Sequence, residues 1–180
     1  MSADGFRRTD SRGAGLDAFG LVADDWMLVT AGTPASWNTM TASWGGFGHL
    51  WNKDVAFTFV RPTRHTFSFM EANGRYTLSF FDEPWRQALN VCGSVSGRDH
   101  DKAAITGLEP FEAAPGAVGF AQARLVLVCR ILHRQDLDPA GFADPAIHGH
   151  YRGDYHRLYV GEVTDALVRD GAPRPPPRRD

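Results

Sequence analysis

The sequence has few features that would point to a metal, a membrane or a nucleic acid. Its 180 residues include two cysteines, Cys92 and Cys129, which lie in apolar segments without CxxC spacing or a His/Cys cluster. We therefore expect two buried free thiols and no metal site. No stretch approaches the ~20 consecutive apolar residues of a membrane-spanning helix. The formal net charge of -2 argues against a general attraction to nucleic acid or anionic membranes, so any anion site must be local.

The two ends of the chain lack the apolar residues of a packed domain. Residues 1–15 are polar and glycine-rich, which predicts a flexible arm, no signal peptide and a cytoplasmic protein. The last ten residues, GAPRPPPRRD, contain prolines that remove backbone donors and favour extended conformations, so we expect a disordered Pro/Arg-rich tail at 171–180. Residues 16–170 suffice for one domain, and a hydrophobic content of 43% is enough for a core.

Short apolar segments predict a mainly β domain with short helices on its connections. In VAFTFV, Val55, Phe57 and Phe59 share one face of a strand, and in RYTLSFF Tyr76, Leu78 and Phe80 do the same. Gly161 in the last apolar segment suggests a bulge or a close approach. There is no regular βαβ alternation and no repeat, so we expect a mostly antiparallel barrel. Strands are predicted at 26–32, 38–46, 55–60, 75–81, 123–132 and 156–168, and helices at 66–72, 84–91 and 99–106, with Thr66 as a cap of the first and Gly107 after the last.

The segment NTMTASWGG contains unusually small residues for a buried strand. Thr41, Ala42 and Ser43 are followed by Trp44 and two glycines. Small side chains leave room and expose backbone N–H and C=O groups. Such a wall suits a flat polar ring system such as a flavin, although a tight corner of a barrel would use the same residues.

The segment VRPTRHT combines cations with an expected helix start. Pro62 ends a strand, Arg61 and Arg64 flank it, and Thr66 begins a helix. Free N–H donors and forked guanidinium groups at a helix start favour phosphate binding. The alternative is a capped helix whose arginines are solvated.

The segment SGRDHDK offers a second group of this kind. Ser96, Gly97 and Arg98 lead into the third predicted helix, its two aspartates are expected to cap that helix, and Lys102 can reach an anion as a point charge. A solvated turn with internal ion pairs would use the same residues. Because neither GxxxxGK[ST] nor GxGxxG occurs, the P-loop and Rossmann types of phosphate site do not apply.

These motifs occur in an order that resembles a known family. WMLVTAG, NTMTASWGGFGHLW, VRPTRHT, SGRDHDK, GLEP and HRLYVGEV, from Trp26 to Val163, look like the flavin reductase-like family of FMN-binding split barrels, related to flavoredoxins. The resemblance implies an antiparallel Greek-key split β-barrel. It also implies a homodimer, FMN rather than FAD in a groove near the dimer interface, and NADH or NADPH as hydride donor.

The resemblance also assigns residues to that groove. His156, which could equally be a structural histidine at a strand start, would lie near the reactive face of the flavin ring. It is the one candidate catalytic residue. Thr41, Ala42, Ser43 and Trp44 would line the flavin, Arg64 and Thr66 would hold phosphate or ribityl oxygens, and Ser96, Gly97, Arg98 and Lys102 would complete the phosphate end. The other implied cofactor-binding residues are Thr39, Met40, Arg61 and His65.

Three functions are compatible with this resemblance. The first is an NAD(P)H:flavin oxidoreductase that passes electrons to a partner oxygenase or another redox protein. The second is a flavoredoxin-like FMN electron carrier without a nicotinamide site. The third is a relative that has lost the flavin and acts as a dimeric scaffold. Reduction by NADH distinguishes the first from the second.

Overall fold

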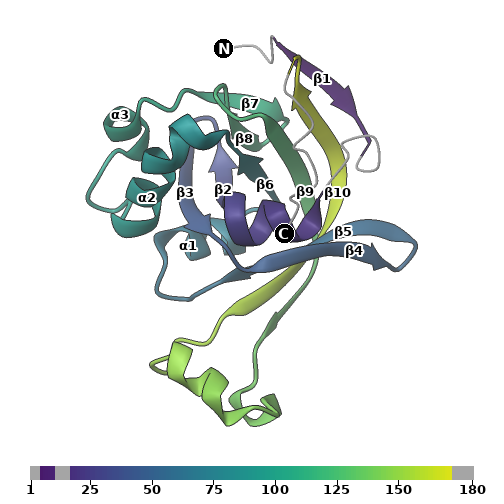
Figure 1. Ribbon diagram of the computed structural model, residues 1–180, viewed down its shortest axis with the longest axis vertical. Helices are drawn as coiled ribbons and strands as arrows, with labels where there is room; N and C mark the ends of the chain where they lie inside the picture. The colour runs from purple at the N-terminus through teal and green to yellow at the C-terminus, as the bar shows by residue number, and fades with distance from the viewer. Residues whose placement is uncertain (1–4, 11–16, 172–180) are drawn as a thin grey trace.

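The computed structural model describes residues 5–10 and 17–171 (Figure 1). The remainder of the expected N-terminal arm and nearly all of the Pro/Arg-rich tail lie outside these ranges. Within this N-terminal segment, Phe6–Thr9 form strand β1, which pairs antiparallel with the end of β10 (Arg157–Arg169). The sequence did not predict this short strand.

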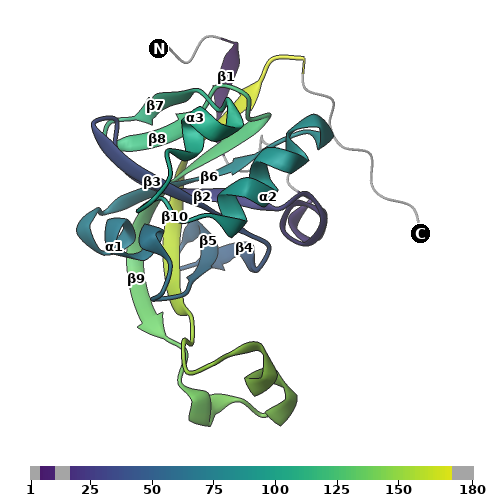
Figure 2. The ribbon, with the colours of Figure 1, turned by 90° about the vertical axis from the view of Figure 1, so that its left-hand side faces the viewer.

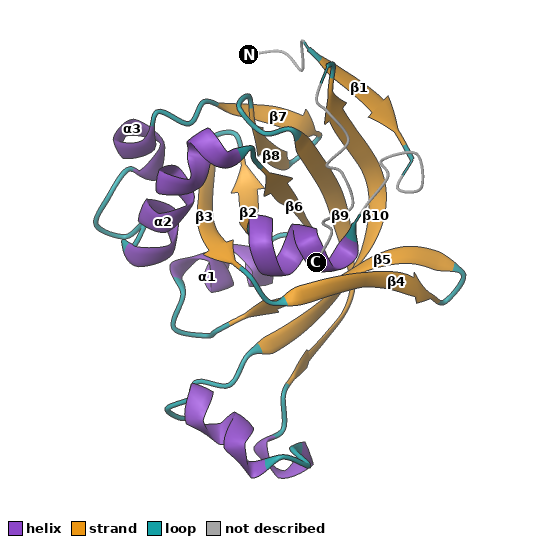
Figure 3. Ribbon diagram, viewed as in Figure 1, coloured by secondary structure: helices purple, strands orange, loops and turns teal. Residues whose placement is uncertain are grey.

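An eight-stranded antiparallel sheet forms the body of the protein. The strand order is β3-β2-β6-β9-β10-β5-β4, with β1 beside β10, and β7 and β8 form a separate hairpin. The sheet curves into an open barrel, which confirms the predicted split-barrel fold (Figures 1 and 3). The strands are β2 (Met27–Thr33), β3 (Ser36–Ala42), β4 (Gly45–Leu50), β5 (Lys53–Val60), β6 (Arg75–Phe80), β7 (Pro110–Ala114), β8 (Ala117–Phe120), β9 (Leu125–Asp136) and β10.

The opening of the barrel lies between β3 and β4. These strands are at opposite ends of the strand order, although only Ser43 and Trp44 separate them in the chain. The prediction of one strand over 38–46 was therefore wrong. The chain leaves the sheet after β3 and re-enters it at Gly45, where a β-carbon would lie 2.8 Å from the carbonyl oxygen of Phe57. We call the gap between β3 and β4 the seam.

The barrel encloses a hydrophobic core, to which the strands contribute the side chains of their inward faces. Tyr76, Leu78 and Phe80 of β6 all lie in the core, sharing one face as the alternation predicts. Strand β5 contributes its smaller residues, Ala56 and Val60, to the same core. Phe57 and Phe59 are on the opposite face of β5 and are only half-buried. The smaller side chains of β5 thus face the barrel interior, and Phe57 and Phe59 face outward.

A second apolar cluster lies between the sheet, the β7–β8 hairpin and α2 (Arg86–Ser94). Cys92 of α2 and Cys129 of β9 are both buried and free, as predicted. Gly161 on β10 marks a bulge, also as predicted, because its register shifts there and a β-carbon would overlap the Tyr76 ring.

The helices differ from the predictions at the starts of α1 and α3 and at both ends of α2, which runs to Ser94 instead of Val91. Helix α1 spans His65–Ala72, and its N-cap residue is Arg64 without a side-chain cap. The predicted cap, Thr66, is instead buried inside the first turn. A 3-10 turn (Glu83–Trp85) precedes α2, and the unpredicted segment Gly20–Asp25 is π-helical.

Helix α3 (Lys102–Thr106) starts three residues later than predicted. Asp101 caps it by accepting a hydrogen bond from the Ala104 N–H at 3.1 Å, and it ends at Gly107 with a φ of 73°, as predicted. The Ser96–Arg98 turn therefore follows α2 and does not begin α3. In the described ranges, no helix is long and apolar enough to cross a membrane.

Strands β9 and β10 extend beyond the barrel and carry a protrusion, residues 137–156, that we call the arm (Figures 1 and 2). It contains two 3-10 segments, Pro139–Gly141 and Pro145–His150. Its rings pack on one another: Tyr151 and Tyr155 have centroids 4.6 Å apart, and Phe142 contacts both. The arm therefore has a small aromatic cluster of its own.

Candidate functional site

Two cavities meet at Arg64, beside the seam. The first, the seam cavity, has a volume of about 190 Å³. The second, the turn cavity, has a volume of about 130 Å³ and lies between the start of α1 and the turn that follows α2. The seam cavity is lined by Met40, Thr41, Ala42, Ser43, Trp44, Phe59, Arg61, Arg64 and His156. The turn cavity is lined by Asn38, Thr63, Arg64, His65, Thr66, Ser94, Val95, Ser96, Gly97, Arg98 and Lys102.

The structure thus brings together residues that are distant in the sequence. Of the residues implied by the resemblance, the two cavities contain all but Thr39. The Thr39 side chain points away from both cavities, where its hydroxyl is hydrogen-bonded to that of Thr30 at 2.8 Å. The backbone carbonyl of Thr39 accepts a hydrogen bond from Lys102.

The seam cavity lies where a sheet edge is left open. Among the described strands, β3 has no hydrogen-bonded neighbour on its seam side, so backbone groups of its last residues are available to a ligand. The linker residues Ser43 and Trp44 continue this wall, and Phe59 of β5 faces it. A flat wall with available N–H and C=O groups can hydrogen-bond the edge of a planar polar ring.

His156 lies at the base of the arm and is only 7% exposed. Its Nδ1 is 3.0 Å from the Tyr151 hydroxyl, and its ring lies 5.3 Å from the Trp44 ring, centroid to centroid. Burial, followed by the charge of Arg61, lowers the pKa of His156 to about 4. The imidazole is therefore neutral at pH 7 and can serve as an uncharged hydrogen-bonding group.

Arg61 binds the arm. It donates hydrogen bonds of 2.8 Å to the Asp154 carboxylate and to the carbonyl of His150, and its guanidinium lies 5.1 Å from the centre of the Tyr151 ring. The VRPTRHT motif suggested a phosphate-binding role for Arg61, but the structure gives its guanidinium these other partners. Arg61 lines the seam cavity, but its donors hold the arm in place beside Trp44.

The floor of the turn cavity is a close contact between β3 and the turn after α2. The amide of Asn38 donates to the Thr66 hydroxyl at 2.6 Å, which joins β3 to α1. Gly97 packs against the same side chain, since a β-carbon at this position would lie 3.0 Å from Cγ of Asn38 and would overlap Oδ1. A glycine is therefore required here by space alone.

The three cations of the turn cavity differ in their partners. Arg64 donates to the carbonyl of Gly93 at 2.8 Å, and Lys102 donates to the carbonyls of Thr39 and Cys92 at 2.7 and 2.9 Å. Burial lowers the pKa of Lys102 to about 8. The exposed Arg98 side chain has no hydrogen bond or ion pair within the described ranges, so it is the cation most available to an anion.

His65, at the first position of α1, has an unsatisfied group. Its Nδ1 is shielded from solvent and has no hydrogen-bond partner in the part of the chain that the structure describes. Burial, together with Arg98 and Lys102, lowers the pKa of His65. A buried nitrogen without a partner carries an energetic cost, which a ligand in the turn cavity can remove.

Sequence reasoning did not predict every residue of this region. The unpredicted lining residues are Asn38, Phe59, Thr63, Ser94 and Val95, and Tyr151 contacts His156 beside them. Phe59 was recognised as part of an alternating strand, but its position opposite the seam depends on pairing between distant strands. Asn38 stands at the start of the NTMTASWGG motif and was read as a strand residue. Tyr151 and its contact with His156 depend on the path of the arm, for which the sequence had no signal.

Comparison with known proteins agrees with this geometry. The profile described as "Flavin reductase like domain" matches residues 19–177, most of the chain. The chain belongs to this family. A search of curated proteins gives no match.

Several solved structures share the fold of this flavin reductase-like chain. Flavoredoxin from Methanosarcina acetivorans superimposes with a TM-score of 0.66 at 20% identity, over 81% of this chain and 69% of that one. Nitrilotriacetate monooxygenase component B from Bacillus cereus gives 0.66 at 17% identity, over 90% and 78%. An NADH:FAD oxidoreductase from Streptomyces globisporus gives 0.62 at 17% identity, over 82% and 76%.

Proposed function

We propose that this protein is a flavin-binding oxidoreductase that holds FMN and accepts hydride from NADH or NADPH. The observation that carries the proposal is the junction of two unlike cavities at Arg64. A wall of small residues with an open strand edge lies on one side, and a group of cations on the other. A flavin mononucleotide has the same two parts, a planar polar ring and a phosphate.

The residues present fit each part of this cofactor. At the ring end, Thr41, Ala42 and Ser43 leave space beside the unpaired edge of β3. At the phosphate end, the unpartnered Nδ1 of His65 and the free guanidinium of Arg98 would gain a partner. The first N–H groups of α1 lack intrahelical acceptors and favour an anion nearby.

When bound, a flavin would supply reversible acceptance of a hydride, and the chain would supply position and environment. Arg64 would fix the register between ring and phosphate, because it lines both cavities. Trp44 and Phe59 would shield the ring end from water. His156 would remain neutral at pH 7 and would therefore add no charge beside the ring. No side chain is required as a nucleophile or general base.

The outer face of the barrel supports a homodimer as part of this proposal. On this face Gly46 is paired with Phe57, and Phe59 is paired with Leu158, so bare backbone adjoins half-buried apolar side chains. Trp44, which is 43% exposed, lies at its margin beside the seam cavity. A second copy on this face would bury apolar surface and cover the ring end.

The deciding experiment is to add NADH or NADPH to the flavin-loaded protein without oxygen. Loss of the 450-nm absorbance within seconds supports the reductase and identifies the donor. A flavin that stays oxidised with both donors, but is reduced by a redox protein, indicates a flavoredoxin-like carrier. Ser43→Phe should abolish flavin binding by filling the seam cavity, whereas Ser68→Phe, on the exposed side of α1, should not. Failure of the wild-type protein to bind flavin would contradict the proposal and would favour the third function, a dimeric scaffold that has lost the flavin.

A further inference from the structure

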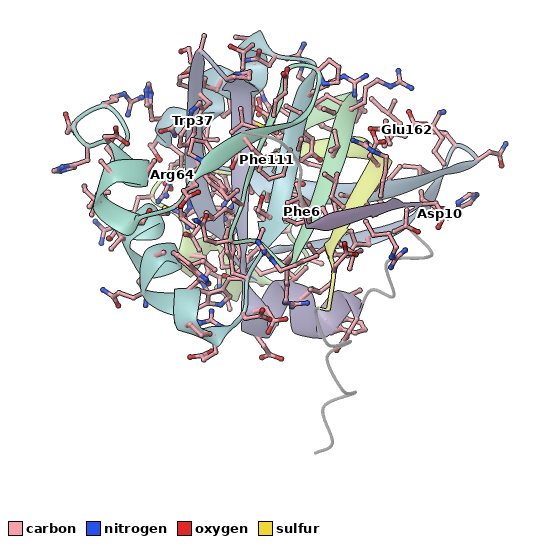
Figure 4. All side chains as sticks on the ribbon, turned by 90° about the horizontal axis from the view of Figure 1, so that it is seen from above. Phe6, Asp10, Trp37, Arg64, Phe111 and Glu162 are labelled. Carbon is pink, nitrogen blue, oxygen red and sulfur yellow. The ribbon has the colours of Figure 1, made fainter. Side chains whose placement is uncertain are left out.

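The arm carries a hydrogen-bonded pair of side chains at the edge of the seam cavity. The Tyr151 hydroxyl lies 3.0 Å from Nδ1 of His156, and the two rings meet edge to face with centroids 5.4 Å apart. His156 lines the seam cavity, whereas Tyr151 lies behind it and does not. Figure 4 shows Arg64, another residue of this cavity, on the opposite side of the molecule from Asp10, which follows β1. The arm, and not the N-terminal strand, therefore borders the cavity.

Several contacts hold the His156 ring in place. Its centroid lies 5.3 Å from that of Trp44 and 6.3 Å from that of Phe59. The backbone carbonyl of His156 accepts a hydrogen bond of 2.9 Å from the Leu137 N–H, which closes the base of the arm. Among the described residues, Tyr151 is the only hydrogen-bond partner of the imidazole. The second ring nitrogen, Nε2, is therefore the polar atom that His156 can offer to the cavity.

The surroundings of the pair indicate which group donates the hydrogen bond. Burial raises the pKa of Tyr151 and lowers the pKa of His156 to about 4, so the phenol and the imidazole are both neutral at pH 7. The charge of Arg61, 5.1 Å from the centre of the Tyr151 ring, makes the phenol a better donor. An unprotonated imidazole nitrogen is also a stronger acceptor than a phenol oxygen. Because a neutral imidazole has one N–H and one acceptor nitrogen, a proton given to Nδ1 by hydrogen bonding leaves the N–H on Nε2.

We propose that Tyr151 is a positioning residue, which orients His156 so that an Nε2–H donor, and not a lone pair, faces the seam cavity. The proposal rests on the proposed function, because the ligand that this donor would meet is the flavin ring. An uncharged donor suits a carbonyl oxygen or an unprotonated nitrogen of that ring. Tyr151 thus acts on the ring end of the site through His156, without touching the ligand itself.

Nitrogen NMR of the histidine side chains in the flavin-free, full-length protein at pH 7 tests the tautomer. The His156 signals are those that disappear in His156→Gln. We expect hydrogen on Nε2 and an unprotonated Nδ1. Tyr151→Phe keeps the aromatic packing of the arm but removes the hydroxyl, so the His156 signals should shift as both tautomers become populated. Hydrogen on Nδ1 in the wild type, or unchanged His156 signals in Tyr151→Phe, would overturn the proposal.

The arm supplies a matched control for this variant. Tyr155 makes the same kind of hydrogen bond, since its hydroxyl lies 2.8 Å from Nδ1 of His148, and neither residue lines the seam or the turn cavity. Tyr155→Phe should therefore leave the His156 signals where they are in the wild type. A shift of these signals in Tyr155→Phe equal to that in Tyr151→Phe would mean that both variants act by loosening the arm, which would overturn a specific role of Tyr151.

Titration with riboflavin, which reports on the ring end alone, tests the effect of the donor on binding. Tyr151→Phe should weaken riboflavin binding about three- to tenfold, the loss expected for one neutral hydrogen bond, and Tyr155→Phe should not. His156→Gln supplies an amide N–H that needs no tautomer, so adding Tyr151→Phe to it should cause no further loss. An equal loss in both backgrounds would overturn the proposal. Absence of flavin binding by the wild type would contradict the proposed function, whereas the NMR signals decide the role of Tyr151 independently.

Discussion

Gly97 packs directly on the side chain of Asn38, and this contact joins the turn after α2 to the edge strand β3. A β-carbon at position 97 would overlap Oδ1 of Asn38, whose amide is already bound to the Thr66 hydroxyl. The contact therefore joins three segments that are distant in the chain: β3, the start of α1 and the Ser96–Arg98 turn. It lies under the turn cavity. We expect the geometry of this contact to determine whether an anion can reach all three segments.

Gly97→Ala should weaken FMN binding at least tenfold, because either Asn38 or the turn must move and the turn cavity changes shape. Riboflavin, which lacks the phosphate, should bind almost as well to the variant as to the wild type. Fluorescence titration with both flavins measures the difference. Gly74→Ala is the control, since a β-carbon there meets no atom within 4 Å. Equal FMN affinity in Gly97→Ala and Gly74→Ala would show that the contact does not shape the site.

Arg98→Ala should also lower the affinity for FMN and not that for riboflavin. One charge-assisted hydrogen bond is worth roughly 1.5–3 kcal/mol, which corresponds to a ten- to hundredfold loss. The free guanidinium has no partner among the described residues to lose, so the melting temperature should not change. Arg152→Ala, at an exposed residue that lines neither the seam nor the turn cavity, should leave both flavins unaffected. A loss of riboflavin affinity in Arg98→Ala would contradict a phosphate contact.

Arg64→Ala should differ from Arg98→Ala. Arg64 lines both cavities and holds the carbonyls of Cys92 and Gly93 at the end of α2. Its loss should reduce the affinity for FMN and for riboflavin, and should lower the melting temperature. Thermal unfolding and paired titrations test this. A variant that lost FMN alone would show that Arg64 acts as a phosphate ligand without a role at the ring.

Asp154→Ala should release the arm from the barrel. The ion pair with Arg61 would be lost, while the packing of the arm's own rings would remain. We expect several-fold faster backbone hydrogen exchange in residues 142–156, with little change in melting temperature. The control is Asp165→Ala, which removes an ion pair between Asp165 of β10 and Arg8 of β1. This ion pair lies away from the arm, so the control should leave exchange in the arm unchanged. Unchanged exchange in the arm of Asp154→Ala would mean that the Arg61–Asp154 ion pair does not hold it.

His156 should make the protein less stable in mild acid. Its pKa is about 4 in the folded protein and near 6.5 when unfolded, so between these values the unfolded chain binds the extra proton. The free energy of unfolding should therefore fall as the pH drops from 6.5 to 4, by about 3 kcal/mol from this residue. His156→Gln should lose correspondingly less stability over this range in urea denaturation. Parallel losses in the two proteins would show that the imidazole is not neutral when folded.

Local sequence patterns predicted most of the fold. Alternation on β6 and the bulge at Gly161 were visible because they depend on neighbours along the chain or on a single unusual residue. The break of 38–46 into two strands was not, since it depends on β3 and β4 occupying opposite edges of the sheet. The inward face of β5 could not be predicted either, because it depends on packing against other strands, as in the contact between the Thr58 and Tyr76 hydroxyls.

For the candidate site, too, local patterns predicted which segments take part but not the contacts between them. The cavities contain residues from both basic motifs and from the small-residue strand, whose compositions indicated ligand binding. The partners of each cation were not predictable, because they are backbone carbonyls or arm residues far away in the sequence. Arg61 is therefore bound to Asp154, Lys102 to Thr39 and Cys92, and only Arg98 is free among the described cations of the turn cavity.

The most direct test of the account is the ratio of FMN to riboflavin affinity in the wild-type protein, measured by fluorescence titration. The joined seam and turn cavities predict one flavin per chain, with FMN bound at least tenfold more tightly than riboflavin. Tight binding of both flavins with equal affinity would contradict the assignment of the turn cavity to the phosphate. Absence of binding by either flavin would contradict the flavin site altogether.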